Sequence, residues 1–539
     1  MTDQANDVTT APSEHAISKE EHRRILVILG ALMLGMFLAA LDQTIVATAL
    51  PTIAGDLHGL NHLSWVVTAY LITSTITMPL WGKFGDLYGR KNFFQISILI
   101  FLAGSMLSGL SQNMLELIAF RAIQGAGAGG LMVGSQAIIG DVIPPRQRGR
   151  YMGYFGAVFG LSSILGPLAG GWFTQHVSWR WIFYINVPIG AVALAAIAVV
   201  LHVPVRRIRH RIDWWGTALL SGGVVGLILV TTWGGFQYAW GSTTIVGLAA
   251  ASVVLLVLFC FVETRAAEPI IPLGLFRNRT FNVASGVGFV VGFVMFGSIV
   301  YLPLYLQIVH GASPTLSGLE LLPMVTGMLL TFVVSGQLVS RTGRYKIFPV
   351  SGLAVMAIGL ALLSVLGAHS SYLDAATYMF VVGLGMGLVM QVLVVAVQNA
   401  VPHSQLGTAT ATTTFFRTIG GAFGVAILGA VFNTQLLNRL RATAPPALLK
   451  LIGGGNISEN PAQISRLPAA DRTLIINAFS HTLQVVFVVS VPIAIGAFVL
   501  SWFLKEIPLR AKAYGAEGVA EGTAAPVPAF DAPGEFPGL

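Results

Sequence analysis

The sequence predicts an all-α integral membrane protein with about fourteen transmembrane helices. Three observations lead to this class: long apolar runs recur along the chain, charged residues make up only 10% of it, and Gly contributes 61 of its 539 residues. Soluble domains carry roughly 25% charged residues, so a soluble fold of this length would lack the charge to cover its surface. Glycine is frequent in membrane helices because it lets helix backbones approach closely.

The apolar runs define the individual helices. Each run is roughly 20 residues or longer, which is enough to cross about 30 Å of hydrocarbon. The first run follows a polar arm and is too long for the core of a signal peptide, so we expect it to remain as the first helix. The predicted spans are residues 25–50, 62–82, 93–112, 115–140, 150–174, 181–203, 213–233, 243–263, 281–308, 315–339, 346–367, 373–400, 406–434 and 479–504.

The Lys and Arg residues predict the orientation of the helices. With the N-terminus in the cytosol, about 22 of the 30 Lys and Arg residues fall in cytosolic segments, as the positive-inside rule requires. Most outer loops carry none, although Arg180 is an exception and the segment 435–478 is long enough to escape the rule. The net charge of +8 is therefore a topology signal and no sign of nucleic-acid binding, and we expect both termini in the cytosol.

An internal repeat divides the chain into halves. The loop that begins at Gly82 has a diverged copy at Gly336, and the glycine triplet that begins at Gly125 has a copy at Gly383. The two loops are eight predicted spans apart, which fits two six-helix halves with an extra helix pair between them. The predicted regions are a cytosolic arm (1–24), an N-terminal half (25–203), a linker with the extra pair (204–280), a C-terminal half (281–504) with an extracytoplasmic loop (435–478), and a disordered cytosolic tail (505–539).

Five short motifs follow one another along the first six predicted helices. They are Leu41–Pro51, Gly82–Lys91, Arg121–Gly127, Gly156–Gly171 and Trp179–Pro188. Together they resemble the motifs of the major facilitator superfamily, and specifically of its fourteen-helix drug:proton antiporter branch. The resemblance implies a major facilitator fold with two extra central helices, a multi-pass place in the cell (inner, cytoplasmic) membrane, and proton-coupled export of amphipathic drugs or toxic molecules, hence antibiotic resistance.

Two charged residues lie well inside the predicted N-terminal half. Asp42 is about 17 residues into the first helix, where a carboxylate is costly and usually marks an ion pathway. Its alternative role is that of a structural acid bonded to a neighbouring helix. Arg121 could likewise serve as a structural partner, but the resemblance implies that it faces the cavity and influences proton release. Gln124 lies one turn further on the same helix face, and Gly125 belongs to the same motif.

The loop between the second and third predicted helices combines one acid with several bases. A tight basic turn explains Lys83, Arg90 and Lys91 but leaves Asp86 unexplained, and Gly82 and Gly89 belong to the same motif. The resemblance implies that this Asp belongs to a conformational latch that closes the cytosolic side in the outward-facing state. Its partners would include the N-terminus of a helix of the other half, here the thirteenth, because a helix N-terminus favours an anion.

The fifth predicted helix carries Gly156, Gly160, Gly166, Pro167 and Gly170. Small residues of this kind form a packing surface, and the proline frees a backbone carbonyl and bends the helix. The resemblance adds that the pattern is typical of exporters.

Several further residues are weaker candidates. Glu320, near the outer end of the tenth helix, is either a second proton site or an interfacial acid. Arg417 is expected to line the cavity or to pair with a carboxylate. The predicted cavity-lining residues are Trp65, Gln124, Phe293, Phe296, Gln391, Gln398, Asn399 and Arg417.

Other functional classes lack their motifs. No G-x4-G-K-[ST] loop, no His pair with metal-ligand spacing and no G-x-S-x-G turn occurs, so we expect no enzyme, no ATP-driven pump, no cofactor and no metal. The expected partners are a small-molecule substrate, protons and the lipid bilayer, with the chain acting as a monomer. Two alternatives remain: export of a lipid or of one dedicated metabolite on the same fold, and a membrane sensor or scaffold that transports nothing.

The predicted orientation can be tested with reporter fusions. Fusions after Arg209 and after Lys512 are expected to report the cytosol, and a fusion at Gly454 is expected to report the outer side. Alkaline phosphatase, which is active only outside, and a fluorescent protein that folds only inside would measure each site. A cytosolic signal at Gly454 would contradict the fourteen-helix count.

Overall fold

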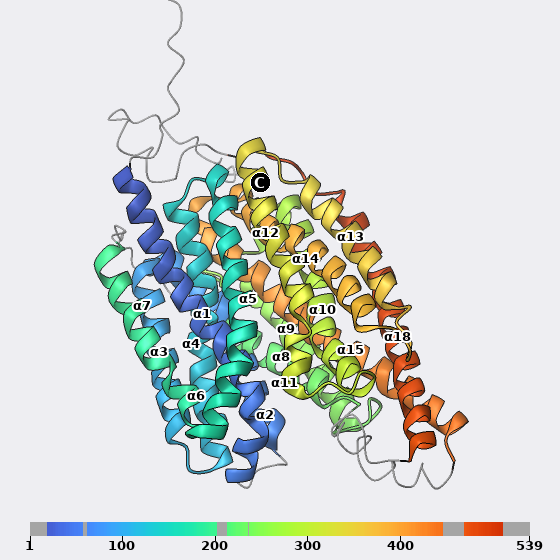
Figure 1. Ribbon diagram of the computed structural model, residues 1–539. Helices are drawn as coiled ribbons and strands as arrows, with labels where there is room; N and C mark the ends of the chain where they lie inside the picture. Colours follow the sequence, from blue (N-terminus) through green and yellow to red (C-terminus); the bar gives the residue numbers. More distant parts are fainter. Residues whose placement is uncertain (1–18, 58–61, 202–212, 236, 446–467, 510–539) are drawn as a thin grey trace, which may run out of the picture.

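The computed structural model describes residues 19–57, 62–201, 213–235, 237–445 and 468–509 (Figure 1). These residues form helices and no β-sheet. Twelve helices of the described chain are long and apolar enough to cross a membrane, and α2 and α13 pack between them as two further helices. This confirms the predicted all-α fold of about fourteen spans. The helices are α1 (Lys19–Asp56), α2 (Leu63–Tyr88), α3 (Arg90–Leu110), α4 (Met114–Val142), α5 (Pro145–His176), α6 (Trp181–Tyr184) continued by α7 (Asn186–Val200), α8 (Trp214–Trp233), α9 (Thr243–Glu263), α10 (Arg279–Ile308), α11 (Pro314–Leu319) continued by α12 (Leu322–Thr342), α13 (Ile347–Leu363), α14 (Tyr372–Ala400), α15 (Leu406–Thr443) and α18 (Ala469–Ser501).

The helices form two bundles, one of α1–α7 and one of α10–α18 (Figure 1). The second bundle has one continuous apolar core, in which Phe281, Met356 and Phe479 are fully buried. The pair α8 and α9 packs through a separate cluster, where Leu220 and Phe415 are buried together. The extra pair therefore contacts both bundles, through α2 on one side and α15 on the other.

Glycines repeat the same helix contacts in the two bundles. A Cβ at Gly125 of α4 would collide with a backbone oxygen of α2, and one at Gly127 with a backbone nitrogen of α3. In α14, Gly383 faces a backbone oxygen of α12 in the same way, and Gly385 faces a backbone nitrogen of α13. The packing of α2, α3 and α4 thus recurs in α12, α13 and α14, because only glycine permits such close approach.

One end of the bundle collects many of the basic residues of the described chain, including Lys83, Arg90, Arg341 and Lys505, and we call it the basic end. The helix α1 begins and α18 ends here (Figure 1). Tyr345 fixes the last described segment, because its hydroxyl donates to the Lys505 carbonyl oxygen at 2.7 Å. Burial raises the pKa of Tyr345 to about 12, so this hydroxyl keeps its proton at neutral pH.

Two helices extend into the segment 435–478, which the sequence predicts as a loop. The helix α15 continues to Thr443, and α18 begins at Ala469. The apolar run ends at 434, but Leu436 and Leu440 stay on the core side of α15 while its other face becomes polar. The rest of this loop (446–467) lies outside the described residues, as do most of the predicted arm and tail (1–18 and 510–539).

Candidate functional site

Asp42, Arg121 and Gln124 form a closed ring of hydrogen bonds inside the N-terminal bundle. The Arg121 Nη1 donates to Asp42 Oδ2 at 2.5 Å and to Gln124 Oε1 at 2.8 Å. The Gln124 Nε2 donates to Asp42 Oδ1 at 2.8 Å. All three side chains are buried, with at most 1% of each exposed. The structure thus brings together an acid from α1 and two residues that lie one turn apart on α4.

Aromatic rings and a backbone oxygen complete the surroundings of Arg121. Its guanidinium carbon lies 4.3 Å from the centre of the Tyr70 ring and 5.9 Å from that of Phe183. Its Nε donates to the Val66 carbonyl oxygen at 3.3 Å. Gly125 makes this arrangement possible, because it lets α4 touch the α2 backbone at Tyr70. The buried cation is therefore paired with an acid and flanked by electron-rich faces, as a charge in this environment requires.

Asp86 binds the N-terminus of α15 at the basic end. Its Oδ1 accepts from the Gly407 backbone N–H at 2.9 Å, and its Oδ2 accepts from the Thr408 N–H at 2.7 Å and the Thr408 hydroxyl at 2.9 Å. The first N–H groups of a helix have no partner within the helix, and the helix dipole favours an anion there. The carboxylate comes from α2 and the helix from the other half, so this cap connects the two bundles.

Arg90 extends the same network. It donates to Asp86 Oδ1 through Nε at 3.2 Å and Nη2 at 2.6 Å, and it also pairs with Asp141 of α4. Its Nη2 reaches the His403 carbonyl oxygen at 3.4 Å, and the His403 ring lies 2.7 Å from Asp141. The network therefore joins α2, α3 and α4 to the segment that precedes α15.

Other residues of the predicted latch have local roles. A Cβ at Gly82 would collide with the side chain of Ala411, so α2 and α15 touch backbone to backbone at this point. Gly89 has a φ of 100°, in the region that favours glycine, and forms the turn between α2 and α3. Lys91 points away from the latch and donates to the Ala198 carbonyl oxygen at 2.8 Å.

The small residues of α5 face two different helices. A Cβ at Gly156 would collide with the ring of Phe332 on α12, and Gly160 also faces α12. Gly166 and Gly170 instead face the Thr44 and Thr48 side chains of α1. Pro167 lies inside the helix, next to Gly166. The predicted packing surface is thus shared between α1 of its own bundle and α12 of the other.

The weaker candidates are spread over the molecule. Glu320 lies at the break between α11 and α12 and is half-buried, away from the ring around Asp42. Trp65 packs edge-to-face against Trp233 of α8. The Phe296 ring packs against Gly421 of α15, and the Phe293 backbone packs against Gly424, while the Phe293 side chain is buried in the core. These aromatic residues therefore fill helix interfaces.

Three amides were expected to line a cavity. Gln398 donates to the Gln136 carbonyl oxygen of α4 at 3.0 Å, and Asn399 donates to the Pro508 carbonyl oxygen at 3.2 Å. Both lie at the basic end and join separate segments. Gln391 is buried on α14 beside Met390.

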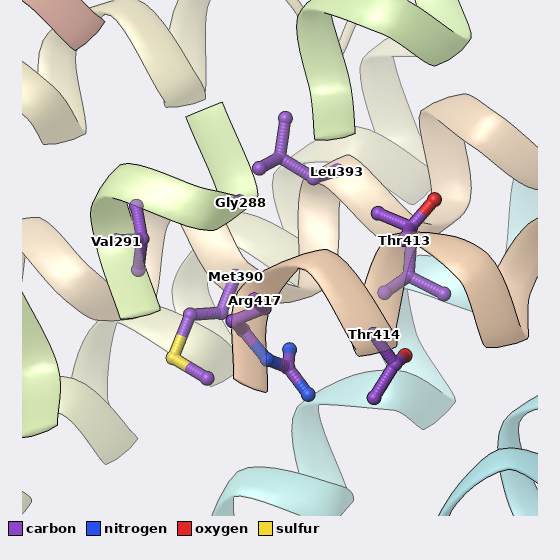
Figure 2. Close-up of a pocket in the computed structure, with 8 residues that line it drawn as sticks. Gly288, Val291, Met390, Leu393, Thr413, Thr414 and Arg417 are labelled. Carbon is purple, nitrogen blue, oxygen red and sulfur yellow. The ribbon is translucent and has the colours of Figure 1, made fainter. Parts of the chain in front are cut away.

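A small cavity lies among α10, α14 and α15, and Figure 2 shows its lining side chains. It offers about 10 Å³ to the centre of a water molecule, which is room for one water. Arg417 lines it, alone among the eight residues predicted to face a cavity. Its lining also includes Val291, Met390, Leu393, Thr413 and Thr414.

Sequence reasoning missed several members of these networks. Asp141 is an acid close to a basic loop, the same signal that singled out Asp86, and that criterion would have found it. Tyr70 and His403 gave no signal, because ordinary spacing does not reveal which ring or carbonyl meets an arginine. The ion pair between Lys83 and Glu268, at 2.8 Å, also joins segments far apart in the sequence.

Comparison with known proteins identifies the family. A profile described as Major Facilitator Superfamily matches residues 32–425. The chain belongs to this superfamily. The multidrug transporter protein MdtP of Bacillus subtilis is 40% identical over 522 residues, covering 92% of this chain and 96% of that protein. An uncharacterized MFS-type transporter of Mycobacterium tuberculosis is 42% identical over 500 residues, covering 93% of this chain and 72% of its own.

Solved structures of superfamily members share the fold. The proton:xylose symporter XylE matches with a TM-score of 0.60 at 14% identity, over 92% of this chain and 99% of that chain. At this identity the match carries the fold alone. The predicted family is confirmed, and the chain is a Major Facilitator Superfamily transporter with relatives named as multidrug transporters and efflux pumps.

The cap on α15 makes a direct prediction. Asp86→Asn removes the anion that binds two helix N–H groups and Arg90, and charged hydrogen bonds of this kind contribute about 1.5–3 kcal/mol each. The basic end should open more often, so a cysteine at Thr410, which is buried there, should react with a maleimide about fivefold faster or more. The native Cys260 is exposed and would first be replaced by Ser.

A matched control is Asp374→Asn. Asp374 also caps a helix, but it caps its own helix α14, bonding to Ser371 within the same turn. This variant should leave the labelling rate at residue 410 unchanged. Equal rates for wild type and Asp86→Asn would show that Asp86 is part of a turn and does not hold the two bundles closed.

Proposed function

We propose that the chain is a proton-coupled antiporter that exports amphipathic drugs or other toxic small molecules by alternating access, as a monomer, with its basic end and both termini in the cytosol. The positive-inside rule supports this orientation, because the basic loops gather at one end. The names of relatives such as MdtP support a multidrug cargo. The glycine pattern of α5 supports export through its resemblance to exporters.

The observation that carries the proton coupling is the buried ring of Asp42, Arg121 and Gln124. The carboxylate there balances a buried cation, so a proton on Asp42 would leave the Arg121 charge without its anion. The protonated ring would therefore differ in stability between conformations that shield it from water and conformations that admit water. A group that couples a gradient to transport must have such a difference.

The latch supplies the conformational change in this proposal. With Asp86 bound to α15, the halves touch at the basic end, and the path to the cytosol is closed. Cargo would enter from the cytosol after this network separates and leave on the other side after it forms again. Protons would move in the opposite direction through Asp42.

Proton release from purified protein tests the coupling. Adding a drug that wild type exports in a liposome screen to purified wild type in weak buffer should release protons, and Asp42→Asn should release none, because the titrating carboxyl is gone while its shape is kept. Uphill efflux in liposomes with an imposed pH gradient should fall at least tenfold. Asp42→Glu should keep part of both signals.

Glu320→Gln is the matched control. It removes the other acid that the sequence singled out, which lies at the break between α11 and α12. This variant should release protons as wild type does. Normal release from Asp42→Asn together with lost release from Glu320→Gln would move the proton site to Glu320 and overturn the proposal.

A further inference from the structure

Arg417 occupies an unusual position for a cation. It lies about three turns after the start of α15, within a membrane-crossing helix. Its backbone packs closely against α10, because a Cβ at Gly292 would collide with the Arg417 carbonyl oxygen. In Figure 2 its guanidinium group extends beside Met390 and Thr414 at the cavity. A charge at this depth normally has a partner or a function.

The buried arginines of the described chain all have acceptors. Arg121 binds Asp42, Arg90 binds Asp86, and Arg148 donates to the Ile143 carbonyl oxygen at 2.8 Å. The Arg417 side chain, which is partly exposed, by contrast makes no hydrogen bond, ion pair or cation–π contact with any residue that the structure describes. The described residues of the C-terminal bundle contain no ring like that of Asp42, Arg121 and Gln124. Met379 of α14 stands in the place that Arg121 has in α4.

The side chains around Arg417 do not supply an anion. The Thr413 hydroxyl donates to the Ala409 carbonyl oxygen at 2.9 Å, and the Thr414 hydroxyl donates to that of Thr410 at 2.9 Å. The remaining wall is apolar and consists of Gly288, Val291, Met390, Leu393 and Val394. The site therefore presents one cation at the edge of an apolar surface, which complements a molecule with an apolar body and one acidic group.

We propose that Arg417 binds the carboxylate of the exported molecule, so that acidic amphiphiles are a preferred class of cargo. The inference rests on the proposed export function and adds the chemistry of its substrate. A guanidinium offers two parallel N–H groups that match a carboxylate, and pairing relieves the cost of an uncompensated charge in an apolar site. The cavity holds about one water in this conformation, so binding takes place in a conformation with a wider cavity.

The position of Arg417 also connects cargo to the latch. The N-terminus of the same helix, α15, is bound by Asp86 at the basic end. An anion bound to Arg417 would therefore contact α15, the helix that Asp86 binds at the basic end.

Equilibrium binding to detergent-solubilised full-length protein tests the proposal. The probes are two fluorescent carboxylates, pyrenebutyrate and naphthoate, each compared with its primary amide, pyrenebutyramide and naphthamide. Wild type should bind each carboxylate about tenfold more tightly than its amide. Arg417→Gln should reduce this affinity ratio to about one. Arg417→Lys should keep part of it, because the charge remains but the two parallel N–H groups are lost.

Arg180→Gln is the control variant, because Arg180 binds backbone oxygens of Gly109 and Ser111 and should leave the ratio unchanged. The carboxylate and amide are compared first on wild type, so a variant that fails to fold does not remove the test. Equal affinities for both pairs on wild type, or an unchanged ratio in Arg417→Gln, would overturn the proposal. No gradient is present in this assay, so its outcome is independent of whether Asp42 couples protons.

Discussion

The bond between the Asp86 carboxylate and the N-terminus of α15 is the interaction on which the arrangement of the two bundles at the basic end depends. It satisfies two helix N–H groups that α15 cannot satisfy itself, and it brings Arg90 and Asp141 into the same network. Closure at this end is therefore largely polar. Polar groups can exchange their partners for water when the halves separate, which suits a contact that must form and break in every transport cycle.

The ring of Asp42, Arg121 and Gln124 also pairs a carboxylate with an arginine, but it does not connect the two bundles. It lies within one bundle and is almost fully buried, so separating the halves does not by itself break it. What changes it is a proton, which removes one charge of the pair and leaves the other buried. The C-terminal bundle has no matching ring among its described residues and instead presents Arg417 without a partner at its cavity. The two halves thus share a helix arrangement but differ in their charges.

The sequence predicted the helices and the family because each depends on local pattern. Apolar runs set the spans, and the glycine triplets that begin at Gly125 and Gly383 predicted that the chain contains two related halves. The segment 435–478 was harder, since α15 continues as a helix with one apolar face after the uniformly apolar run ends. Asp42 and Arg121 stood out because a charge is rare inside an apolar helix, and Asp86 stood out as an acid among bases. Tyr70 and His403 are ordinary residues whose roles depend on tertiary contact. The isolation of Arg417 could not be predicted, because it is set by what surrounds the side chain in three dimensions.

The central claim is that protonation of Asp42 opens the basic end, where Asp86 binds the N-terminus of α15. Double electron–electron resonance between spin labels at Asn92 and Thr342, exposed sites at the basic end of each bundle, tests this most directly. In wild type the distance between the labels should increase as the pH is lowered, because the protonated antiporter must open toward the cytosol to release its proton. In Asp42→Asn the distance should be independent of pH. The same pH-dependent change in both proteins would contradict the claim.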